Sequence, residues 1–233
     1  IIAAGGVPTI GKPAKIIEKL SDAGVFDAGG LLVGSYAFGC FGNILGVSFR
    51  SELLRTEDMD LAYDLDIEVG FIRDIRDDIK SAHPEMQQPG QINPWVPPYE
   101  MKAPDGFKIE FLTTRKSPSE KQPVPIESFG VNAQTIEFLD YITSDPVKAV
   151  VLHNQGILVN VPNPARYAVH KLYVSTGRPP HEQGKAKKDL LQAAALFEYY
   201  LENNVGALLL AADEAKNRND GLKTFIETGM KRA

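Results

Sequence analysis

The stretch Thr56-Glu57-Asp58-Met59-Asp60-Leu61 decides the fold, because acidic and apolar residues alternate along it. Successive side chains of a β-strand point to opposite faces, so Asp58 and Asp60 would share one face of a strand and Met59 and Leu61 the other. The alternation continues to Ile67. It predicts a strand with one apolar face and one acidic face, and Asp64 and Asp66 continue the acidic face.

A second acidic strand is predicted over residues 107–113, which include Lys108-Ile109-Glu110-Phe111-Leu112. Glu110 stands between two apolar residues, where a charged group is costly unless it has a partner. Magnesium prefers oxygen ligands, mainly carboxylates, phosphates and water. We therefore predict that Asp58, Asp60 and Glu110 bind divalent metal ions.

A phosphate-binding element is predicted at Gly34-Ser35, between the short apolar strand Leu31-Leu32-Val33 and a helix over residues 36–45. Glycine allows the backbone to approach a phosphate closely, and the N-terminus of a helix favours an anion. The Ser35 hydroxyl would add a donor. A serine in this position is most often a helix cap, and here both roles can hold together.

Each of these features also has a plainer explanation, since an Asp-x-Asp pair on an alternating strand is commonly a solvated face. The order of Gly34-Ser35, then Asp58 and Asp60, then Glu110 favours a functional interpretation. A phosphate grip combined with metal-binding carboxylates is typical of metal-assisted phosphoryl-group chemistry.

The rest of the chain predicts an α/β (α+β) fold, in which a small mixed sheet precedes a helical C-terminal part. Helices are expected over residues 13–23, 68–81, 133–142, 164–175 and 185–202, with one or two more at the C-terminus. A hairpin is expected over residues 149–161, and irregular structure in the proline-rich stretch 83–106 and in the loop 115–130. The expected domains are an N-terminal helical segment (1–24), an α/β domain (25–145) and a hairpin-plus-helices domain (146–233).

Composition restricts the class of protein. A net charge of -5 argues against a general nucleic-acid clamp, although Lys185, Lys187 and Lys188 form a local basic cluster. No apolar run approaches the roughly 20 residues that cross a bilayer, and the single cysteine fits a cytoplasmic location. The chain begins at Ile1 without methionine, so we expect it to be a fragment of a longer protein.

The segment Gly6 to Pro13 matches the spacing of a P-loop up to its lysine, Lys12. A P-loop needs a serine or threonine after that lysine to bind magnesium. Pro13 stands there instead, so we reject this motif.

The motifs around Gly34-Ser35, Asp58-Met59-Asp60 and Lys108 to Leu112 together resemble the DNA polymerase β-like nucleotidyltransferase superfamily. Leu45-Gly46-Val47 and Thr56 are similar to a bacterial subgroup of standalone, mostly uncharacterised members. So are two later segments, Pro164 to Leu172 and Arg178 to Asp189. The resemblance covers roughly residues 25–200.

The resemblance implies that two magnesium or manganese ions are bound by Asp58, Asp60 and Glu110, and that a nucleoside triphosphate is the substrate. Gly34 and Ser35 would hold its β- and γ-phosphates, and Glu110 would assist deprotonation of the acceptor. Further triphosphate contacts are expected from the helical part, with Lys171 first, then Arg178 and Lys188.

Several choices stay open on the sequence alone. The acceptor is RNA, a protein or a small molecule, and the alternative function is a catalytically inactive module that binds nucleotide or a partner. Lys171 and the lysine cluster are either phosphate contacts or ordinary surface residues. Trp95 and Tyr99 either stack on a base or acceptor or pin the proline-rich loop, and His170 is expected to be a packed histidine.

Overall fold

The computed structural model describes residues 6–66, 73–90, 93, 95–117 and 119–218. The chain divides into two compact units. Unit 1 comprises Ile1–Ser48 and Leu54–Val161, and unit 2 comprises Phe49–Leu53 and Pro162–Ala233. Unit 1 contains the mixed sheet and unit 2 is helical in the part described, so the expected fold class is confirmed.

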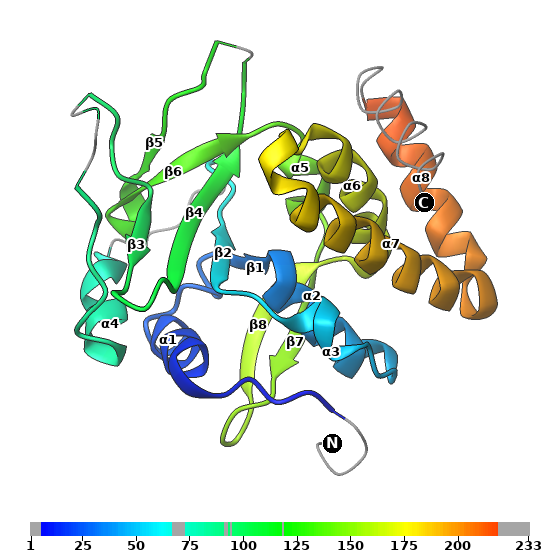
Figure 1. Ribbon diagram of the computed structural model, residues 1–233, viewed down its shortest axis with the longest axis horizontal. Coiled ribbons are helices and arrows are strands. Elements are labelled where there is room, and N and C mark those ends of the chain that lie inside the picture. Colours follow the sequence, from blue (N-terminus) through cyan, green and yellow to red (C-terminus); the bar gives the residue numbers. More distant parts are fainter. Residues whose placement is uncertain (1–5, 67–72, 91–92, 94, 118, 219–233) are drawn as a thin grey trace. The chain divides into compact units, whose positions relative to one another are not determined.

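A six-stranded mixed sheet forms the centre of unit 1 (Figure 1). Its strands are β1 (Leu31–Val33), β2 (Asp58–Ala62), β3 (Glu100–Lys102), β4 (Lys108–Thr114), β5 (Val124–Ile126) and β6 (Val131–Ile136). The order is β1-β2-β4-β6-β5, and β3 pairs with the first half of β4. The β2–β4 and β4–β6 pairs are parallel, whereas β1, β3 and β5 each run antiparallel to their neighbour.

Alternation along β2 and β4 gives the sheet one buried apolar face. Met59 and Ile109 lie opposite each other, as do Leu61 and Phe111, and all four side chains are buried. The residues between them, which are charged, are only partly buried and lie on the other face. The pattern that predicted the strands therefore also decides which residues reach the charged face.

In the described part of unit 1, the α-helices that surround the sheet are α1 (Gly11–Asp22), α2 (Gly34–Leu45), α4 (Ile75–Ala82) and α5 (Leu139–Thr143). Helices α1 and α4 pack against each other beside the sheet (Figure 1). The contact is apolar, because Ile16, Ile17 and Leu20 of α1 and Ile75 and Ile79 of α4 are fully buried. Helix α2 packs on β1, β2 and β7.

The predicted hairpin is confirmed as β7 (Pro146–Val151) and β8 (Ile157–Pro162). Its turn uses positive φ angles at Asn154 (48°) and Gly156 (91°). The hairpin belongs to unit 1 rather than to the C-terminal part. Buried Asn160 explains this, because its amide donates hydrogen bonds to the carbonyl oxygens of Phe26 (2.6 Å) and Gly30 (2.9 Å).

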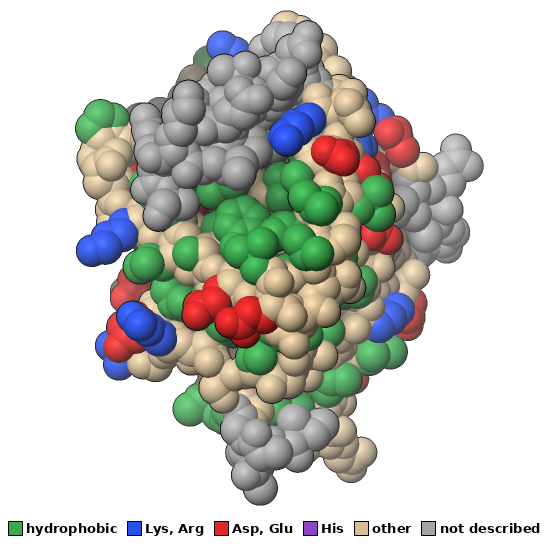
Figure 2. Space-filling model, turned by 90° about the vertical axis from the view of Figure 1, so that its right-hand side faces the viewer, with side chains coloured by type: hydrophobic (Ala, Val, Ile, Leu, Met, Phe, Trp, Pro, Cys, Tyr) green, Lys and Arg blue, Asp and Glu red, His purple; other side chains and the backbone are tan. Residues whose placement is uncertain are grey.

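Unit 2 is built from α6 (Pro164–Gly177), the 3-10 turn η3 (Pro180–Glu182), α7 (Gln183–Asn203) and α8 (Val205–Arg218), with most of the short helix α3 (Ser51–Leu54). Buried Gln192 holds the separate segment in place, because its amide donates to Leu53 O (2.8 Å) and its Oε1 accepts from the Tyr167 hydroxyl (3.0 Å). Figure 2 shows hydrophobic side chains gathered on one face of the molecule. Exposed apolar residues of α7 and α8 include Leu201, Val205, Leu209 and Leu210.

Four predictions about secondary structure need correction. The helix expected over residues 133–142 is wrong: strand β6 comes first, with Val131, Ala133 and Thr135 buried in a two-residue period, and only α5 is helical. Strand β2 ends at Ala62, so Asp64 and Asp66 lie beyond it. Strand β3 lies within the proline-rich stretch, and β5 lies within the loop expected over residues 115–130.

The helix predicted from residue 68 is seen as α4 from Ile75, and residues 67–72 lie outside the described part. Within the residues that the structure describes, no helix combines the length and the apolar character that a membrane span requires. The rejection of a P-loop agrees with the contacts of Lys12, which pairs with Asp105 and lies 5.6 Å from the centre of the Phe107 ring.

Candidate active site on strands β2 and β4

The charged face of the sheet brings the predicted carboxylates together. In the parallel β2–β4 pair, Asp60 lies opposite Glu110 and Asp58 lies opposite Lys108. Directly opposite residues of paired strands project to the same face, with Cβ atoms about 5 Å apart. Two rows, each with one residue from β2 and one from β4, therefore place three carboxylates and one ammonium group on one small area.

Strand β3 extends this area on the other side of β4. Glu100 lies opposite Glu110, and Lys102 lies opposite Lys108. Acidic residues thus fill one row across three strands, whereas the other row holds one acid and two lysines. The sequence analysis missed this part, since the prolines around β3 hide a strand of only three residues.

Lys108 is a site residue that the sequence analysis did not select. Its Nζ atom lies 2.7 Å from Glu110 Oε1, and both side chains are 23% exposed. Burial lowers the pKa of Lys108, but the hydrogen bond that Lys108 donates to Glu110 and the charges of Glu110, Asp58 and Glu100 outweigh this effect, so the pKa is raised. The i, i+2 spacing of Lys108 and Glu110 on a predicted strand could have revealed the pair.

Gly34 brings the start of α2 against Asp60. Its φ angle is +61°, and a Cβ atom at this position would collide with the Asp60 Oδ2 atom. Glycine is required here on both counts, since other residues rarely adopt this conformation. The Asp60 carboxylate therefore lies beside the backbone at the N-terminus of a 12-residue helix.

The interpretation of Ser35 as a helix cap is wrong. Helix α2 begins at Gly34, its N-cap residue is Val33, and no side chain caps it. Ser35 is the second residue of the helix and is partly exposed. The first backbone N–H groups of a helix have no partner within the helix and carry a partial positive charge, which gives the end of α2 the properties of an anion-binding site.

Tyr36, another residue not selected from the sequence, connects α2 to the acidic row. Burial raises the pKa of its phenol, and the negative charges of Asp58 and Asp60 raise it further. The phenol therefore stays protonated and is able to act as a hydrogen-bond donor beside two carboxylates. The residues on either side of Tyr36 in the sequence are mostly apolar, so the sequence does not indicate that its phenol lies near Asp58 and Asp60.

Thr56 fixes the entry into β2. Its Oγ1 atom accepts a hydrogen bond from the Asp58 N–H (3.3 Å) and donates one to the Asp58 carbonyl oxygen (3.1 Å). Both bonds involve the main chain of the first acidic residue. Thr56 thus orients the start of the strand through the main chain. It does not use the Asp58 carboxylate, which lies on the charged face of the sheet.

The carboxylates of this face meet only part of what a pair of divalent ions requires. Asp58 and Asp60 lie two positions apart on one strand face, and carboxylate oxygens suit magnesium or manganese. Among the described residues, however, no three acidic, histidine or cysteine side chains converge closely enough to form a metal site. Two of the predicted ligands fit an ion, whereas Glu110 is engaged by Lys108.

The basic residues expected to contact the triphosphate lie in unit 2. Lys171, on α6, is buried and pairs with Asp189 of α7 at 2.5 Å. Arg178 donates to the other oxygen of Asp189 (3.0 Å) and to Glu182 (3.1 Å). Both cations are therefore engaged in an ion-pair network that joins α6 to α7.

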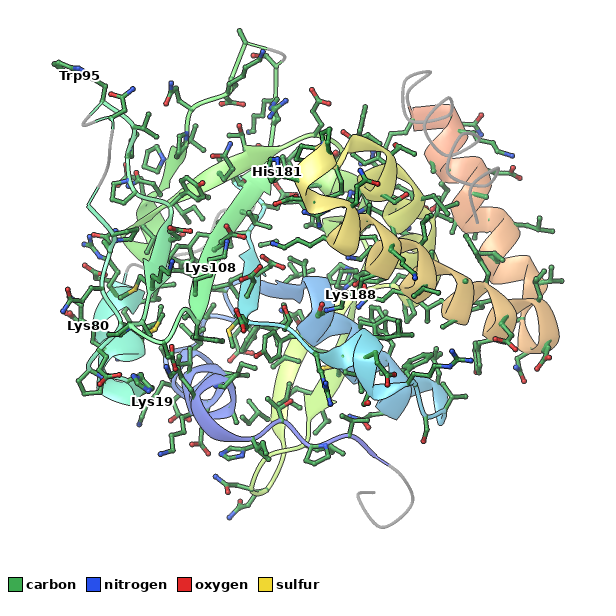
Figure 3. The ribbon with its side chains drawn as sticks, viewed as in Figure 1. Lys19, Lys80, Trp95, Lys108, His181 and Lys188 are labelled. Carbon is green, nitrogen blue, oxygen red and sulfur yellow. The ribbon has the colours of Figure 1, made fainter. Side chains whose placement is uncertain are left out.

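Lys188 is the third of these predicted contacts, and it lies partly exposed in the second turn of α7 (Figure 3). Lys185 and Lys187 precede it and are exposed. Three lysines near a helix N-terminus oppose the helix dipole, so the arrangement does not stabilise α7 by itself.

Two aromatic predictions have different outcomes. Trp95 is 87% exposed and projects away from its loop, so it does not pin that loop (Figure 3). Tyr99 lies next to β3, and its pKa is raised by burial and by the charges of Glu100 and Glu110.

His170 is buried as expected, and burial, with the charge of Lys171, lowers its pKa to about 3.

Comparison with known proteins identifies the family of the chain. A nucleotidyltransferase family model matches residues 12–217, so the chain belongs to this nucleotidyltransferase family. An antigenic nucleotidyltransferase-like protein from Paracoccidioides brasiliensis has a solved structure with 16% sequence identity and a TM-score of 0.41, over 92% of this chain and 93% of that chain. The search of curated proteins found no match.

Gly34→Ala is expected to destabilise the chain by about 1–2 kcal/mol from the backbone conformation alone, and further through the collision with Asp60. Gly39→Ala, in the same helix, is the matched control. Its Cβ would meet only Leu54 Cδ2 at 3.9 Å, and alanine should stabilise the helix by up to about 1 kcal/mol. Urea unfolding measures both free energies, and equal effects would contradict the proposed closeness of Gly34 and Asp60.

Lys171→Ala is expected to cost about 3–5 kcal/mol, since it removes one partner of a buried ion pair. Lys187→Ala, on an exposed position of α7, should change the free energy of unfolding by less than about 0.5 kcal/mol. The comparison is made by thermal and urea unfolding. A stability unchanged by Lys171→Ala would show that the lysine does not hold α6 to α7.

Proposed function

We propose that the chain transfers a nucleoside monophosphate from a nucleoside triphosphate to an acceptor and releases pyrophosphate, in the presence of magnesium or manganese. One observation carries the proposal. Asp60 lies both opposite Glu110 in the sheet and against the N-terminus of α2, so acidic and anion-binding groups meet at one place. Membership of the nucleotidyltransferase family supports the reaction class.

The N-terminus of α2 is proposed to bind the β- and γ-phosphates. Gly34 carries no side chain that would stand in the way, the N-terminus of a helix favours an anion, and the Ser35 hydroxyl adds a donor. Tyr36, protonated beside Asp58 and Asp60, supplies another donor at the same place. Phosphate oxygens would thus be bound mainly by fixed dipoles rather than by flexible lysines.

The carboxylates are proposed to bind the divalent metal, with Asp58 and Asp60 as its ligands. The bound metal supplies positive charge that offsets the charge of the phosphates and of the leaving pyrophosphate. The acceptor oxygen attacks the α-phosphorus, and the bond from this phosphorus to the pyrophosphate oxygen breaks. Glu110 takes the proton of the acceptor hydroxyl, since a carboxylate at the reacting centre is suited to act as a general base.

The charge of the chain gives only partial information about the class of acceptor. The chain as a whole carries a net charge of -5, which does not favour nucleic acid, whereas Lys185, Lys187 and Lys188 form a local basic group. We propose RNA, a protein or a small molecule as the acceptor. Lys171, Arg178 and Lys188 are proposed as further contacts of the triphosphate, and for Lys171 and Arg178 this would require a change in their ion pairs with Asp189.

The proposal is tested by calorimetric titration with ATP, GTP, CTP and UTP, each with magnesium and with EDTA. At least one nucleotide should bind with magnesium, and EDTA should abolish or strongly reduce the binding. The Asp58→Ala/Asp60→Ala double variant should lose binding at least about 100-fold, as expected when two metal ligands are removed.

The Asp64→Ala/Asp66→Ala double variant is the matched control. It removes the same two charges at the same spacing, but from residues beyond the end of β2. It should bind nucleotide as the unchanged chain does. Equal losses in both double variants, or no magnesium-dependent binding to the unchanged chain, would contradict the proposal. Binding with no label transferred from α-labelled triphosphate to any acceptor would favour a binding module.

A further inference from the structure

The lysine beside Glu110 changes what the charged face is able to bind. The resemblance to the polymerase β-like superfamily implies two metal ions on three carboxylates. In this chain the third carboxylate already has a cation, because Lys108 Nζ lies 2.7 Å from Glu110 Oε1. Lys108 lies on β4 (Figure 3), directly opposite Asp58. Its position is therefore inside the area that the two-ion arrangement would occupy.

We infer that the face takes one divalent ion, at Asp58 and Asp60, and that the Lys108 ammonium group occupies the place of the second ion at Glu110. The inference rests on the proposed function and refines it. Lys108 is on this view a positioning residue. It acts through Glu110, whose carboxylate group it holds in place on the face.

Distances limit the alternative in which both cations bind Glu110. A magnesium ion binds a carboxylate oxygen at about 2.1 Å, so an ion on Glu110 Oε1 would lie within about 5 Å of the ammonium nitrogen. Repulsion between two cations at that distance is strong when the surroundings are only partly solvated. Both side chains are largely shielded from solvent, at 23% exposure, which limits screening by water.

The arrangement of acids agrees with a single ion. Among the residues that the structure describes, no three acidic, histidine or cysteine side chains converge as metal ligands. Asp58 and Asp60 lie on one strand and Glu110 on another. A one-ion site needs only the first two acids together with triphosphate oxygens and water, and magnesium is commonly bound in this way.

The neighbouring lysine provides a comparison within the same sheet. Lys102 lies opposite Lys108 on the next strand, is exposed, and is farther from Asp58 and Asp60 by one strand. Strands are spaced about 4.8 Å apart. If only charge on this face mattered, removal of either lysine would have a similar effect, whereas a specific role of Lys108 predicts different effects.

The test counts bound manganese by electron paramagnetic resonance. The probe is Mn²⁺ with saturating α,β-methylene-ATP, or the corresponding analogue of the base preferred in the titration. The unchanged chain should hold one ion per complex, without the spin coupling that two ions about 4 Å apart would show. Lys108→Met should hold two coupled ions, Lys108→Arg one, and the control Lys102→Met one.

A second variant keeps the test decisive if Lys108→Met does not fold. Glu110→Gln should leave the number of bound ions at one and their affinity within about twofold, because Glu110 is not a ligand of that ion. In a two-ion site the same change would remove an ion or weaken it about 10-fold or more, as loss of a metal contact does.

Each other result overturns the inference. Two coupled ions in the unchanged chain would leave the proposed function intact and refute the single-ion site. One ion in both the unchanged chain and Lys108→Met would refute the role of Lys108. No manganese in the unchanged chain would contradict the proposed function itself, and the inference would fail with it.

Discussion

The parallel pairing of β2 with β4 is the constraint on which the site depends. Its register sets Met59 against Ile109 in the core and, one position along, Asp60 against Glu110 on the opposite face. A shift of one residue in either strand would bury the carboxylates and expose the core residues. The apolar contacts that stabilise the sheet therefore also fix the place of the acidic side chains, and Lys108 and the N-terminus of α2 complete the face.

Much of this could be predicted from the sequence, because alternation in β2 and β4 is regular and the glycine after β1 is informative. Elements without such signals were missed. Strand β3 has three residues within a proline-rich stretch, and its pairing with β4 depends on tertiary contacts. The region of β6 was misread as a helix, since the apolar residues in 133–142 also fit a helical spacing, and the sheet decides between the two. The hairpin joined unit 1 through Asn160, a contact over more than 130 residues that no local pattern reveals.

The site shows the same division between local and distant information. Spacing placed Asp58 and Asp60 on one face, and alternation in a second strand added Glu110. The ion pair of Glu110 with Lys108 and the approach of Tyr36 to the aspartates, however, appear only in three dimensions. Conversely, Lys171 and Arg178 matched a motif as phosphate contacts, whereas the structure shows both engaged with Asp189. Charged residues can be selected by type from a sequence, but their partners are decided by packing.

The central claim is that one face of the sheet, formed by β2 and β4, binds a metal and a nucleoside triphosphate. The most direct test is a crystal structure with Mn²⁺ and a non-hydrolysable triphosphate, in which anomalous scattering locates manganese independently of the protein atoms. The account predicts an anomalous peak between the carboxylates of Asp58 and Asp60, with triphosphate density at Gly34 and Ser35. Nucleotide bound elsewhere, or manganese away from both aspartates, would contradict it.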